Sequence, residues 1–511
     1  MTRVAIAASS EISAQAGAEL ADAGGNAVDA VLGAALVSMC TDIGIVSPAG
    51  GALIAIWPPT GDPVVIDGCP EMPGRGEDPE RFGDASWEVV FDYGGKARQR
   101  VGFGSVATPG AFAAMGVASE QFGSLPWSHV LQPAIRWAER GFPLRGGAAE
   151  YLSYTHEAIF SWSPDSYRLL HHSDGRPLAE GDKVLIPELA DSLMQIASDG
   201  VDAFYSGELG QRIAAGIQAE GGLLNQADLD AYRAALHEPI TLDLDDWRIA
   251  TCPPPSIGGP CLAAMLLLLR KCPEHELNTA AIHWLVHTQQ AVLNYRAQKL
   301  DAAGDELADE VERLLQIAKL GESSKLLSAP STIHVSAVDS NGRACSLTAS
   351  AGYGSGAMVP GTGIWLNNSL GEVDLHPKGL SGIAAGTRLL SNMAPTVARS
   401  KDGTLIAIGS PGASRITTAL AQSIWHHVHF GNSLHAAIEH PRLHVEIGAE
   451  EPAISYERGL PVTPGNGFEL REFDRLSMYF GGVQAVRWSP SEAFTAVADS
   501  RRSGHVAYGG E

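Results

Sequence analysis

The sequence is poor in basic residues, in cysteine and in long apolar runs, and each shortage excludes a class of protein. Among 511 residues, 35 are Lys or Arg against 58 Asp or Glu, and the formal net charge is −23. Nucleic acids and anionic membrane surfaces bind basic faces, so neither is an expected partner. We interpret the acidity as a solvated surface. The longest apolar run covers residues 262–269, far fewer than the roughly 20 residues of a membrane-spanning helix.

The six cysteines are scattered, with no CxxC pair and no histidine nearby at ligand spacing. They are Cys40, Cys69, Cys252, Cys261, Cys272 and Cys345. This arrangement argues against disulfides and zinc, and it favours buried free thiols in a reducing compartment. The first residues, MTRVAIAASSEISAQAG, contain no apolar stretch of signal-peptide length. We therefore expect a cytoplasmic protein that needs no metal and no cofactor.

Helical patterns dominate the first 300 residues, and strand patterns become frequent after Thr332. The expected helical regions are 12–40, 111–141, 186–235 and 256–300, with an early strand pair at 50–57 and 62–67. From residue 301, a charged helix gives way to a loop of small polar residues that ends at Ser331. The later strand-like runs are 333–338, 344–350, 362–367, 404–409 and 494–498. This order indicates layered packing in which helices cover sheets.

Thr332 stands at the first position of a predicted β-hairpin. The flanking runs alternate apolar and polar residues, and the DSNG sequence at 339–342 is typical of the turn between them. If the bond before Thr332 is cut, the new α-amine, with an ordinary pKa of about 7.7–8.0, lies beside the threonine hydroxyl. One residue then supplies both the nucleophile and its base. The pattern alone also fits an ordinary strand start.

Three glycine-rich turns invite a functional interpretation. Residues 409–415, GSPGASR, join a predicted strand to a predicted helix, and N–H groups at such a helix start can bind an oxyanion. The same turn is also common at ordinary helix entries. Segment 24–30 lacks the strand-GxGxxG-helix context of a phosphate loop, so we interpret it as helix packing. Segment 253–259 is interpreted as a rigid turn entering a helix, with a place at the site as the alternative.

Histidines near these segments are not assigned catalytic roles. His426 and His427 have no Cys or carboxylate at ligand spacing, so we interpret them as packing or solvated side chains. His334 lies two residues after Thr332 and therefore shares its strand face. We expect His334 to pack near the site without acting as the base, because an N-terminal amine already fills that role.

Ten segments in one order, over about residues 5–445, resemble the γ-glutamyltransferase family of N-terminal-nucleophile hydrolases. They are GGNAVDA (24–30), SVATPGAFAAM (105–115), PAIRWAERGFPL (133–144), GGLLNQADLDAY (221–232), PPPSIGG (253–259), STIHVSAVDSNG (331–342), VPGTGIWLNN (359–368), RLLSNMAPTV (388–397), GSPGASRI (409–416) and HPRLH (440–444). The resemblance implies an α+β fold, a four-layer αββα sandwich formed jointly by two pieces of a self-cleaved precursor. The pieces would be 1–331 and 332–511.

The resemblance also implies the site residues. Thr332 matches the family's nucleophile, and the Ser331–Thr332 bond matches its self-cleavage site. Ser350 falls where the family has a threonine that hydrogen-bonds the freed amine, and it keeps the hydroxyl. Gly412 and Ala413 match the glycine pair of the oxyanion hole. The implied substrate-binding residues are Ser369, Glu372, Ser391 and Asn392.

The implied substrate pocket departs from the family pattern. Glutamyl-specific members carry an arginine for the α-carboxylate just after the early strand pair, where this sequence has Gly68, Cys69 and Pro70. Arg75 lies several residues further on and could substitute only if the loop were reshaped. An acidic pair that binds the α-amine in many members is replaced by LGE, in which Glu372 is the nearest carboxylate.

The resemblance implies an enzyme that passes through an acyl-enzyme. Its direct implication is cleavage or transfer of a γ-glutamyl amide, with a small-molecule acyl donor and water or an amine as acceptor. A first alternative is a diverged cytoplasmic hydrolase of a non-glutamyl acyl group, through an amide or an activated C–C bond, in natural-product biosynthesis. A second alternative is an uncleaved homologue that only binds a ligand. A homo-oligomer is left open.

Overall fold

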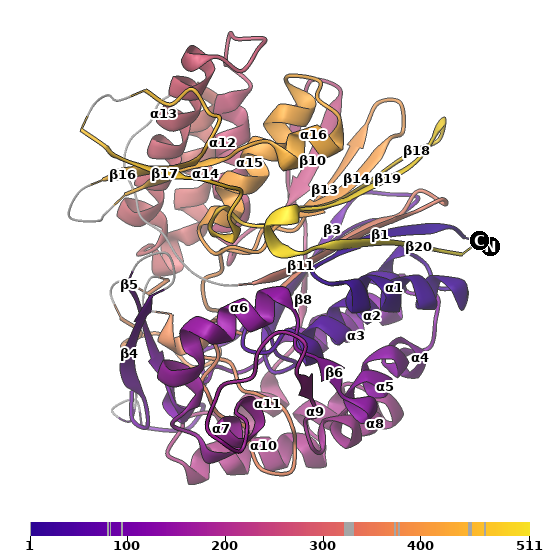
Figure 1. Ribbon diagram of the computed structural model, residues 1–511, viewed down its shortest axis with the longest axis vertical. Helices are drawn as coiled ribbons and strands as arrows, with labels where there is room; N and C mark the ends of the chain where they lie inside the picture. Colours follow the sequence, from indigo (N-terminus) through magenta and orange to yellow (C-terminus); the bar gives the residue numbers. More distant parts are fainter. Residues whose placement is uncertain are drawn as a thin grey trace.

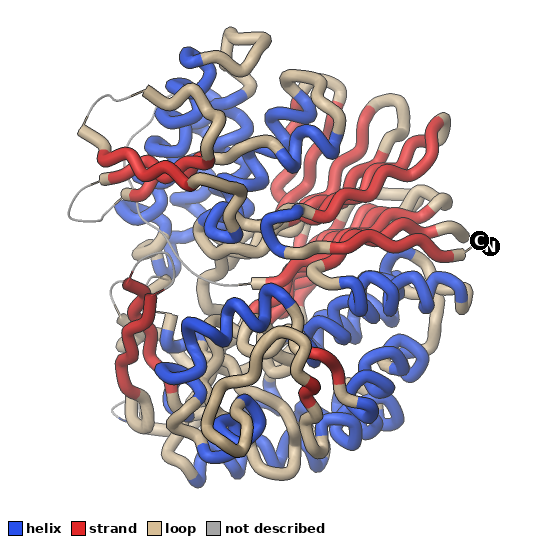
Figure 2. The backbone as a smooth tube through the Cα atoms, viewed as in Figure 1, coloured by secondary structure: helices blue, strands red, loops and turns tan. Residues whose placement is uncertain are grey.

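The structure is a computed structural model that describes residues 2–78, 81, 83–92, 96–320, 332–372, 375–376, 379–447, 452–463 and 467–510. Two sheets lie face to face, with one set of helices on the outer face of each (Figure 1). Figure 2 shows the two strand layers enclosed between the two helical layers. The predicted α+β, four-layer αββα architecture is confirmed.

Both main sheets are antiparallel. The first has the order β20 (His505–Gly509), β1 (Val4–Ala8), β11 (Ile333–Asp339), β12 (Ala344–Ser350), β2 (Gly51–Trp57), β3 (Val64–Gly68) and β8 (Ala235–His237). The second has the order β19 (Glu492–Ala498), β18 (Gln484–Ser489), β14 (Leu405–Gly409), β13 (Thr396–Ser400), β10 (Trp247–Thr251) and β9 (Ile240–Leu244). Strands from the two ends of the chain, β1 and β20, thus lie together on one side of β11.

Helices cover the outer face of each sheet. On the first sheet lie α1 (Glu11–Asp22), α2 (Ala27–Thr41) and α3 (Ala111–Phe122). On the second lie α12 (Gly258–Leu269) and α15 (Arg415–Val428), and behind α12 pack α13 (Thr279–Tyr295) and α14 (Leu307–Leu320). Among the described residues, no helix combines the length and apolar character needed to cross a bilayer.

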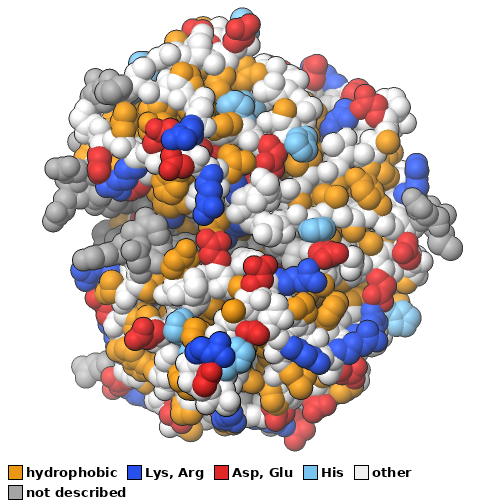
Figure 3. Space-filling view, in the orientation of Figure 1, with side chains coloured by type: hydrophobic (Ala, Val, Ile, Leu, Met, Phe, Trp, Pro, Cys, Tyr) orange, Lys and Arg blue, Asp and Glu red, His pale blue; other side chains and the backbone are white. Residues whose placement is uncertain are grey.

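Smaller elements surround this sandwich. The remaining helices are α4 (Trp127–Val130), α5 (Gln132–Arg140), α6 (Gly146–Thr155), α7 (Pro164–Leu170), α8 (Leu189–Asp199), α9 (Asp202–Tyr205), α10 (Glu208–Ala219), α11 (Gln226–Ala231) and α16 (Leu434–Glu439). The remaining strands are β4 (Trp87–Asp92), β5 (Lys96–Val101), β6 (Phe142–Pro143), β7 (Lys183–Val184), β15 (Leu443–Glu446), β16 (Ala453–Glu457) and β17 (Glu469–Phe473). On the face seen in Figure 3, acidic and basic side chains are interspersed over both halves of the molecule.

Small side chains allow the two sheets to approach each other. Ala5, Ala7, Ala55 and Ala407 belong to the cluster between the sheets, whereas the larger aliphatic clusters lie between each sheet and its helices. Burying these outer faces stabilises the fold by about 25 cal/mol per Å² of apolar surface. The layers therefore follow from strands that carry small residues on one face and large ones on the other.

Strand β11 shows this alternation most clearly. Ile333 and Val335 face the helices, and His334 and Ser336 face the second sheet. His334 Nδ1 and Nε2 are hydrogen-bonded to Thr348 Oγ1 and Ser336 Oγ, both at 2.8 Å. Complete burial lowers the pKa of His334 to about 3, so the ring is neutral. Because hydroxyls occupy both ring nitrogens and the ring lines neither of the pockets beside Thr332, His334 is a packing residue between the sheets.

Two predictions from local pattern have different outcomes. Segment 24–30 caps α2: Asn26 Oδ1 accepts the Val28 N–H at 2.7 Å, and the Asn26 N–H donates to Asp29 at 2.8 Å, which confirms helix packing. The predicted strand at 362–367 is wrong. There, only single bridges join Leu366 to Ala49 and Trp365 to Met358, because a glycine turn interrupts extension.

Candidate active site

Thr332 lies at the start of β11, buried to 3% exposure. Strand β11 pairs Ile333 with Ala349, so the same register continued by one residue sets Thr332 opposite Ser350, on the face toward the second sheet. Residues opposite each other in an antiparallel pair have Cβ atoms about 4.5–5.5 Å apart. The two hydroxyl side chains are therefore cross-strand neighbours. Ser331, the other half of the predicted cleavage site, lies outside the described residues.

A pocket of about 30 Å³, here called the Ser350 pocket, lies on the β12 side of Thr332. It contains every predicted substrate-binding side chain together with Thr332 and Ser350. Its lining residues are Pro70, Thr332, Ser350, Ser369, Glu372, Leu375, Leu389, Leu390, Ser391, Asn392 and Met393. The fold thus brings together residues from five segments of the chain.

Buried hydrogen bonds position the walls of the Ser350 pocket. The Asn367 side chain donates to the carbonyls of Ala49 and Ala107 and accepts from the N–H of Ser369 at 3.0 Å. On the opposite wall, Ile257 N–H donates to Ser391 O at 2.8 Å, and Ser256 Oγ donates to the Met393 carbonyl at 2.6 Å.

Segment 253–259 is therefore scaffold that holds Ser391 and its neighbours, as predicted. Its residues are absent from the described lining of the Ser350 pocket. Its Ser256 also forms a single parallel bridge with Ser391.

Glu372 is the single charged side chain among the described lining residues of the Ser350 pocket. Arg75 instead pairs with Glu71 at 3.0 Å and with Asp228 at 3.4 Å, so it does not replace the missing arginine. Arg388 is paired with Glu71 at 2.8 Å and lies over the Tyr232 ring at 4.3 Å. Neither guanidinium lines the pocket.

The turn between β14 and α15 has an unusual backbone. Gly412 has φ +122° and Ala413 has φ +66°, a left-handed conformation that costs a non-glycine residue about 1–2 kcal/mol. Among the described residues, neither N–H has a hydrogen-bond acceptor, whereas both carbonyls accept from the first turn of α15. Pro411 and Thr332 line one cavity. The two amides therefore follow directly after a residue that shares a cavity with Thr332, and their role in an oxyanion hole stays a prediction.

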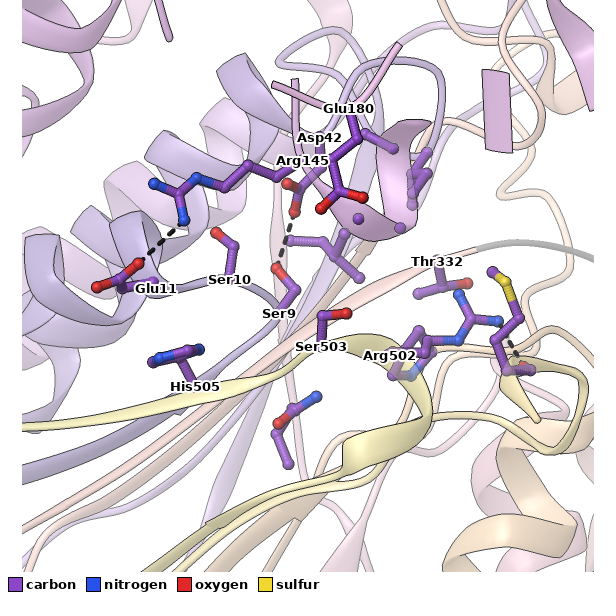
Figure 4. A pocket seen from close by; sticks show the side chains of 18 residues that line it. Ser9, Ser10, Glu11, Asp42, Arg145, Glu180, Thr332, Arg502, Ser503 and His505 are labelled. Atoms are coloured by element: carbon purple, nitrogen blue, oxygen red, sulfur yellow. Dashed lines mark hydrogen bonds and ion pairs between the residues drawn. The ribbon is translucent and has the colours of Figure 1, made fainter. Parts of the chain in front are cut away.

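A second and larger cavity, here called the Asp42 cavity, lies on the β1 and β20 side of Thr332 (Figure 4). Its volume is about 160 Å³. It is lined by Ser9, Ser10, Glu11, Asp42, Ile45, Arg145, Gly146, Gly147, Ala148, Glu180, Thr332, Ile333, Pro411, Met478, Gln484, Arg502, Ser503 and His505. Sequence reasoning missed this cavity.

Asp42 caps the C-terminal end of α2 and is half-buried. Ser9 Oγ donates to its carboxylate at 2.8 Å. Burial raises the pKa of Asp42 to about 6, and the hydrogen bonds from Ser9 and Ser38 oppose that rise. A carboxylate at the end of an apolar helix is the sequence signal that could have drawn attention to it, since the helix dipole disfavours an anion there.

The other predicted histidines pack as expected. His426 is buried, stacks on His440 with ring centroids 4.2 Å apart, and has its pKa lowered to about 3 chiefly by burial. His427 Nδ1 is hydrogen-bonded to the Asn432 carbonyl at 2.8 Å. All six cysteines are buried and free.

A four-layer αββα sandwich with a buried threonine at the start of a central strand defines the class of N-terminal-nucleophile hydrolases. Comparisons with known proteins give the family within that class. The sequence profile described as gamma-glutamyltranspeptidase matches residues 13–509. The chain belongs to the gamma-glutamyltranspeptidase family and is an enzyme of its hydrolase and acyltransferase type.

Named relatives include two kinds of proenzyme. The chain is 32% identical to the acylase ACY 1 proenzyme of Pseudomonas sp. (strain SE83), over 96% of this chain and 91% of that protein. It is 28% identical to the glutathione hydrolase proenzyme of Bacillus subtilis (strain 168), over 98% and 90% of the two chains. Among solved structures, the cephalosporin acylase from Bacillus halodurans matches with a TM-score of 0.78 and 24% identity, covering 99% of this chain and 96% of that one.

Proposed function

We propose that the chain is a self-processing acylase in which Thr332 is the nucleophile. The observation that carries this proposal is that Thr332 shares one pocket with Ser350 and with all four predicted substrate-binding residues. Cleavage of the Ser331–Thr332 bond divides the chain into pieces 1–331 and 332–511, and the proenzyme names of the relatives support such a division.

In the proposed reaction, Thr332 Oγ1 attacks the amide carbonyl carbon and its proton passes to the freed α-amine. Ser350 accepts a hydrogen bond from that amine and orients it. The N–H groups of Gly412 and Ala413 stabilise the oxyanion. The C–N bond then breaks, the proton moves to the departing nitrogen, and an ester on Thr332 remains. Water or a second amine releases the acyl group by the reverse sequence.

We further propose that the acyl group is short and lacks an α-carboxylate. A volume of about 30 Å³ holds two or three water molecules, and each water needs roughly 10–15 Å³ of this space. Apolar walls from Pro70, Leu375 and Leu389 suit an alkyl chain. A carboxylate would have no cation in the described lining, and a charge-assisted hydrogen bond contributes roughly 1.5–3 kcal/mol.

A second candidate is γ-glutamyl amide cleavage or transfer, as the family's direct implication. Glu372 favours it, because its carboxylate could bind the α-ammonium group of a glutamyl donor. A place in the cytoplasm and in natural-product biosynthesis stays a prediction from the sequence.

A panel of acyl p-nitroanilides tests the acyl group. Acetyl, butyryl, glutaryl and γ-glutamyl donors are compared on purified protein, with Thr332→Ala as the blank. We expect the short neutral donors to exceed γ-glutamyl in kcat/KM by about tenfold or more, because the latter leaves its carboxylate unpaired. Faster turnover of the γ-glutamyl donor would establish the second candidate. Equal rates of p-nitroaniline release by the wild-type protein and by Thr332→Ala would instead favour a homologue that only binds a ligand.

A further inference from the structure

Thr332 lies between two hollows, and the proposed acyl binding uses only one of them. In the first sheet, β12, β2 and β3 lie on one side of β11, and β1 and β20 lie on the other. The Ser350 pocket is on the first side and the Asp42 cavity on the second. A substrate amide whose carbonyl carbon is at Thr332 extends in two directions. With its acyl group in the Ser350 pocket, its amine half enters the Asp42 cavity.

The Asp42 cavity offers more room than the Ser350 pocket. Its volume of about 160 Å³ would hold on the order of ten water molecules by the same measure. Figure 4 shows two walls, with Asp42, Arg145 and Glu180 on one and Arg502, Ser503 and His505 on the other. Thr332 lies at one end of the space between them. An amine of several non-hydrogen atoms therefore fits beside the nucleophile.

The charge of Asp42 is the unexplained feature of this cavity. Its contacts are hydroxyls, from Ser9 at 2.8 Å and from Ser38, and no cation among the described residues opposes its charge. Its place at the C-terminal end of α2 adds an unfavourable interaction with the helix dipole. A carboxylate so placed costs folding free energy, and a bound cation would remove that cost.

The neighbouring charges do not neutralise Asp42. Arg145 is paired with Glu11 at 2.9 Å at the cavity rim, where their side chains are 44% and 40% exposed. Glu180 on the same wall is exposed, so solvent screens its charge, and Arg502 belongs to the opposite wall. The wall that carries Asp42 is therefore suited to a positive group.

We propose that the Asp42 cavity binds the amine half of the substrate, and that this half carries a second amine whose ammonium group binds Asp42. Linear diamines and the side-chain amine of a basic amino acid have this chemistry. The assignment of the amine half to the Asp42 cavity rests on the proposed role of Thr332 as nucleophile. Binding of a free diamine to Asp42 does not depend on that role. An experiment can therefore reject the catalytic proposal without rejecting diamine binding, or the reverse.

Isothermal titration of the wild-type protein without any acyl donor tests the proposal. The probes are 1,3-diaminopropane and 1,3-propanediol, which have the same chain length, whereas only the diamine carries ammonium groups. At pH 7.5 we expect the diamine to bind about tenfold or more tightly than the diol, since an ion-paired hydrogen bond contributes at least that factor. Asp42→Asn is expected to remove this difference. The matched control Glu180→Gln changes an exposed carboxylate of the same wall and is expected to weaken diamine binding less than threefold, because solvent screens it.

Equal affinity for the diamine and the diol, no detectable binding of the diamine, or a diamine affinity that Asp42→Asn leaves unchanged would each overturn the proposal. Loss of the native circular dichroism spectrum in Asp42→Asn would also overturn it, because that outcome makes Asp42 a structural residue. Failure of the acyl panel together with intact, Asp42-dependent diamine binding would reject the proposed catalysis and leave the cavity assignment standing.

Discussion

The two hollows beside Thr332 differ in how they are built and in what the sequence could say about them. The Ser350 pocket is small, mixes apolar and polar side chains, and carries one charged group, Glu372. The Asp42 cavity is about five times larger by volume and has charged side chains of both signs among its lining residues. On the proposed function, the difference means that Thr332 would serve two halves of a substrate that differ in size and in charge.

The largest expected effect comes from the residue that both hollows share. Thr332→Ala is expected to leave the chain uncut and to lower kcat/KM by about 10⁴-fold or more, because nucleophile and base are lost together. Thr332→Ser keeps the hydroxyl and is expected to restore both processing and turnover in part. If Thr332→Ala kept activity near the wild-type level, Thr332 would not be the nucleophile, and the two cavities would not share a reaction centre.

The next effect concerns the turn above Thr332. Gly412→Val is expected to lower kcat by about 10²–10³-fold, since a Cβ there would lie 2.8 Å from Gly481 Cα and would displace the N–H groups. The matched control is Gly431→Ala, at another positive-φ glycine (+68°) with no atom within 4 Å of the added Cβ. A control that loses as much activity as Gly412→Val would show general strain and not loss of the oxyanion hole.

Glu372→Gln separates the two candidate acyl groups in the Ser350 pocket. Donors that carry an amine on the acyl chain are expected to lose about tenfold in kcat/KM, because an ammonium would lose its carboxylate partner. Neutral acyl donors should change far less. The measurement is the same p-nitroanilide panel, and a uniform loss across all donors would contradict a selective role for Glu372.

In the Asp42 cavity, the carboxyl group of Asp42 is expected to make the free energy of unfolding depend on pH. Its pKa is about 6 in the folded protein against an ordinary 3.8, so between these values the folded state holds a proton that the unfolded state lacks. Stability from this group is therefore present below about pH 4 and is lost as pH rises through about 6. The Tm of Asp42→Asn relative to wild type should rise between pH 5 and pH 7.5. A Tm difference that shrinks over this range would contradict the sign.

The smallest effect is expected at Ala413. Ala413→Gly removes the left-handed strain of φ +66° at a cost in unfolded-chain entropy, so Tm should rise by no more than about 1–2 °C. Differential scanning fluorimetry measures the change. A clear fall in Tm would mean that the alanine methyl group contributes packing that outweighs its backbone strain.

Local pattern was sufficient for elements whose signals lie within a few residues. The hairpin around Asp339–Gly342 and the buried helix after Asn26 formed as predicted, because turn chemistry and capping act over three or four positions. The resemblance to the family predicted that Ser391 and Glu372 both bind substrate, and the structure has both in the Ser350 pocket. Local sequence pattern alone could not have brought these two residues together.

Features made by distant segments could not be predicted in this way. The Asp42 cavity joins Ser9, Arg145 and Ser503, which lie far apart along the chain and carry no common motif. Arg75 could replace the missing arginine only with a reshaped loop, and the sequence could not show that Asp228, far along the chain, pairs with it instead. The strand predicted at 362–367 did not form because the turn at Gly361 and Gly363, both with positive φ, interrupts extension and leaves single bridges in place of a ladder.

Mass spectrometry of active protein, with sequencing of each new amino terminus, tests the central claim most directly. The account predicts two pieces, the smaller beginning Thr-Ile-His at Thr332 and ending with the chain, and a single uncut species for Thr332→Ala. An active preparation that consists of intact chain, or a new terminus at any other residue, would contradict it.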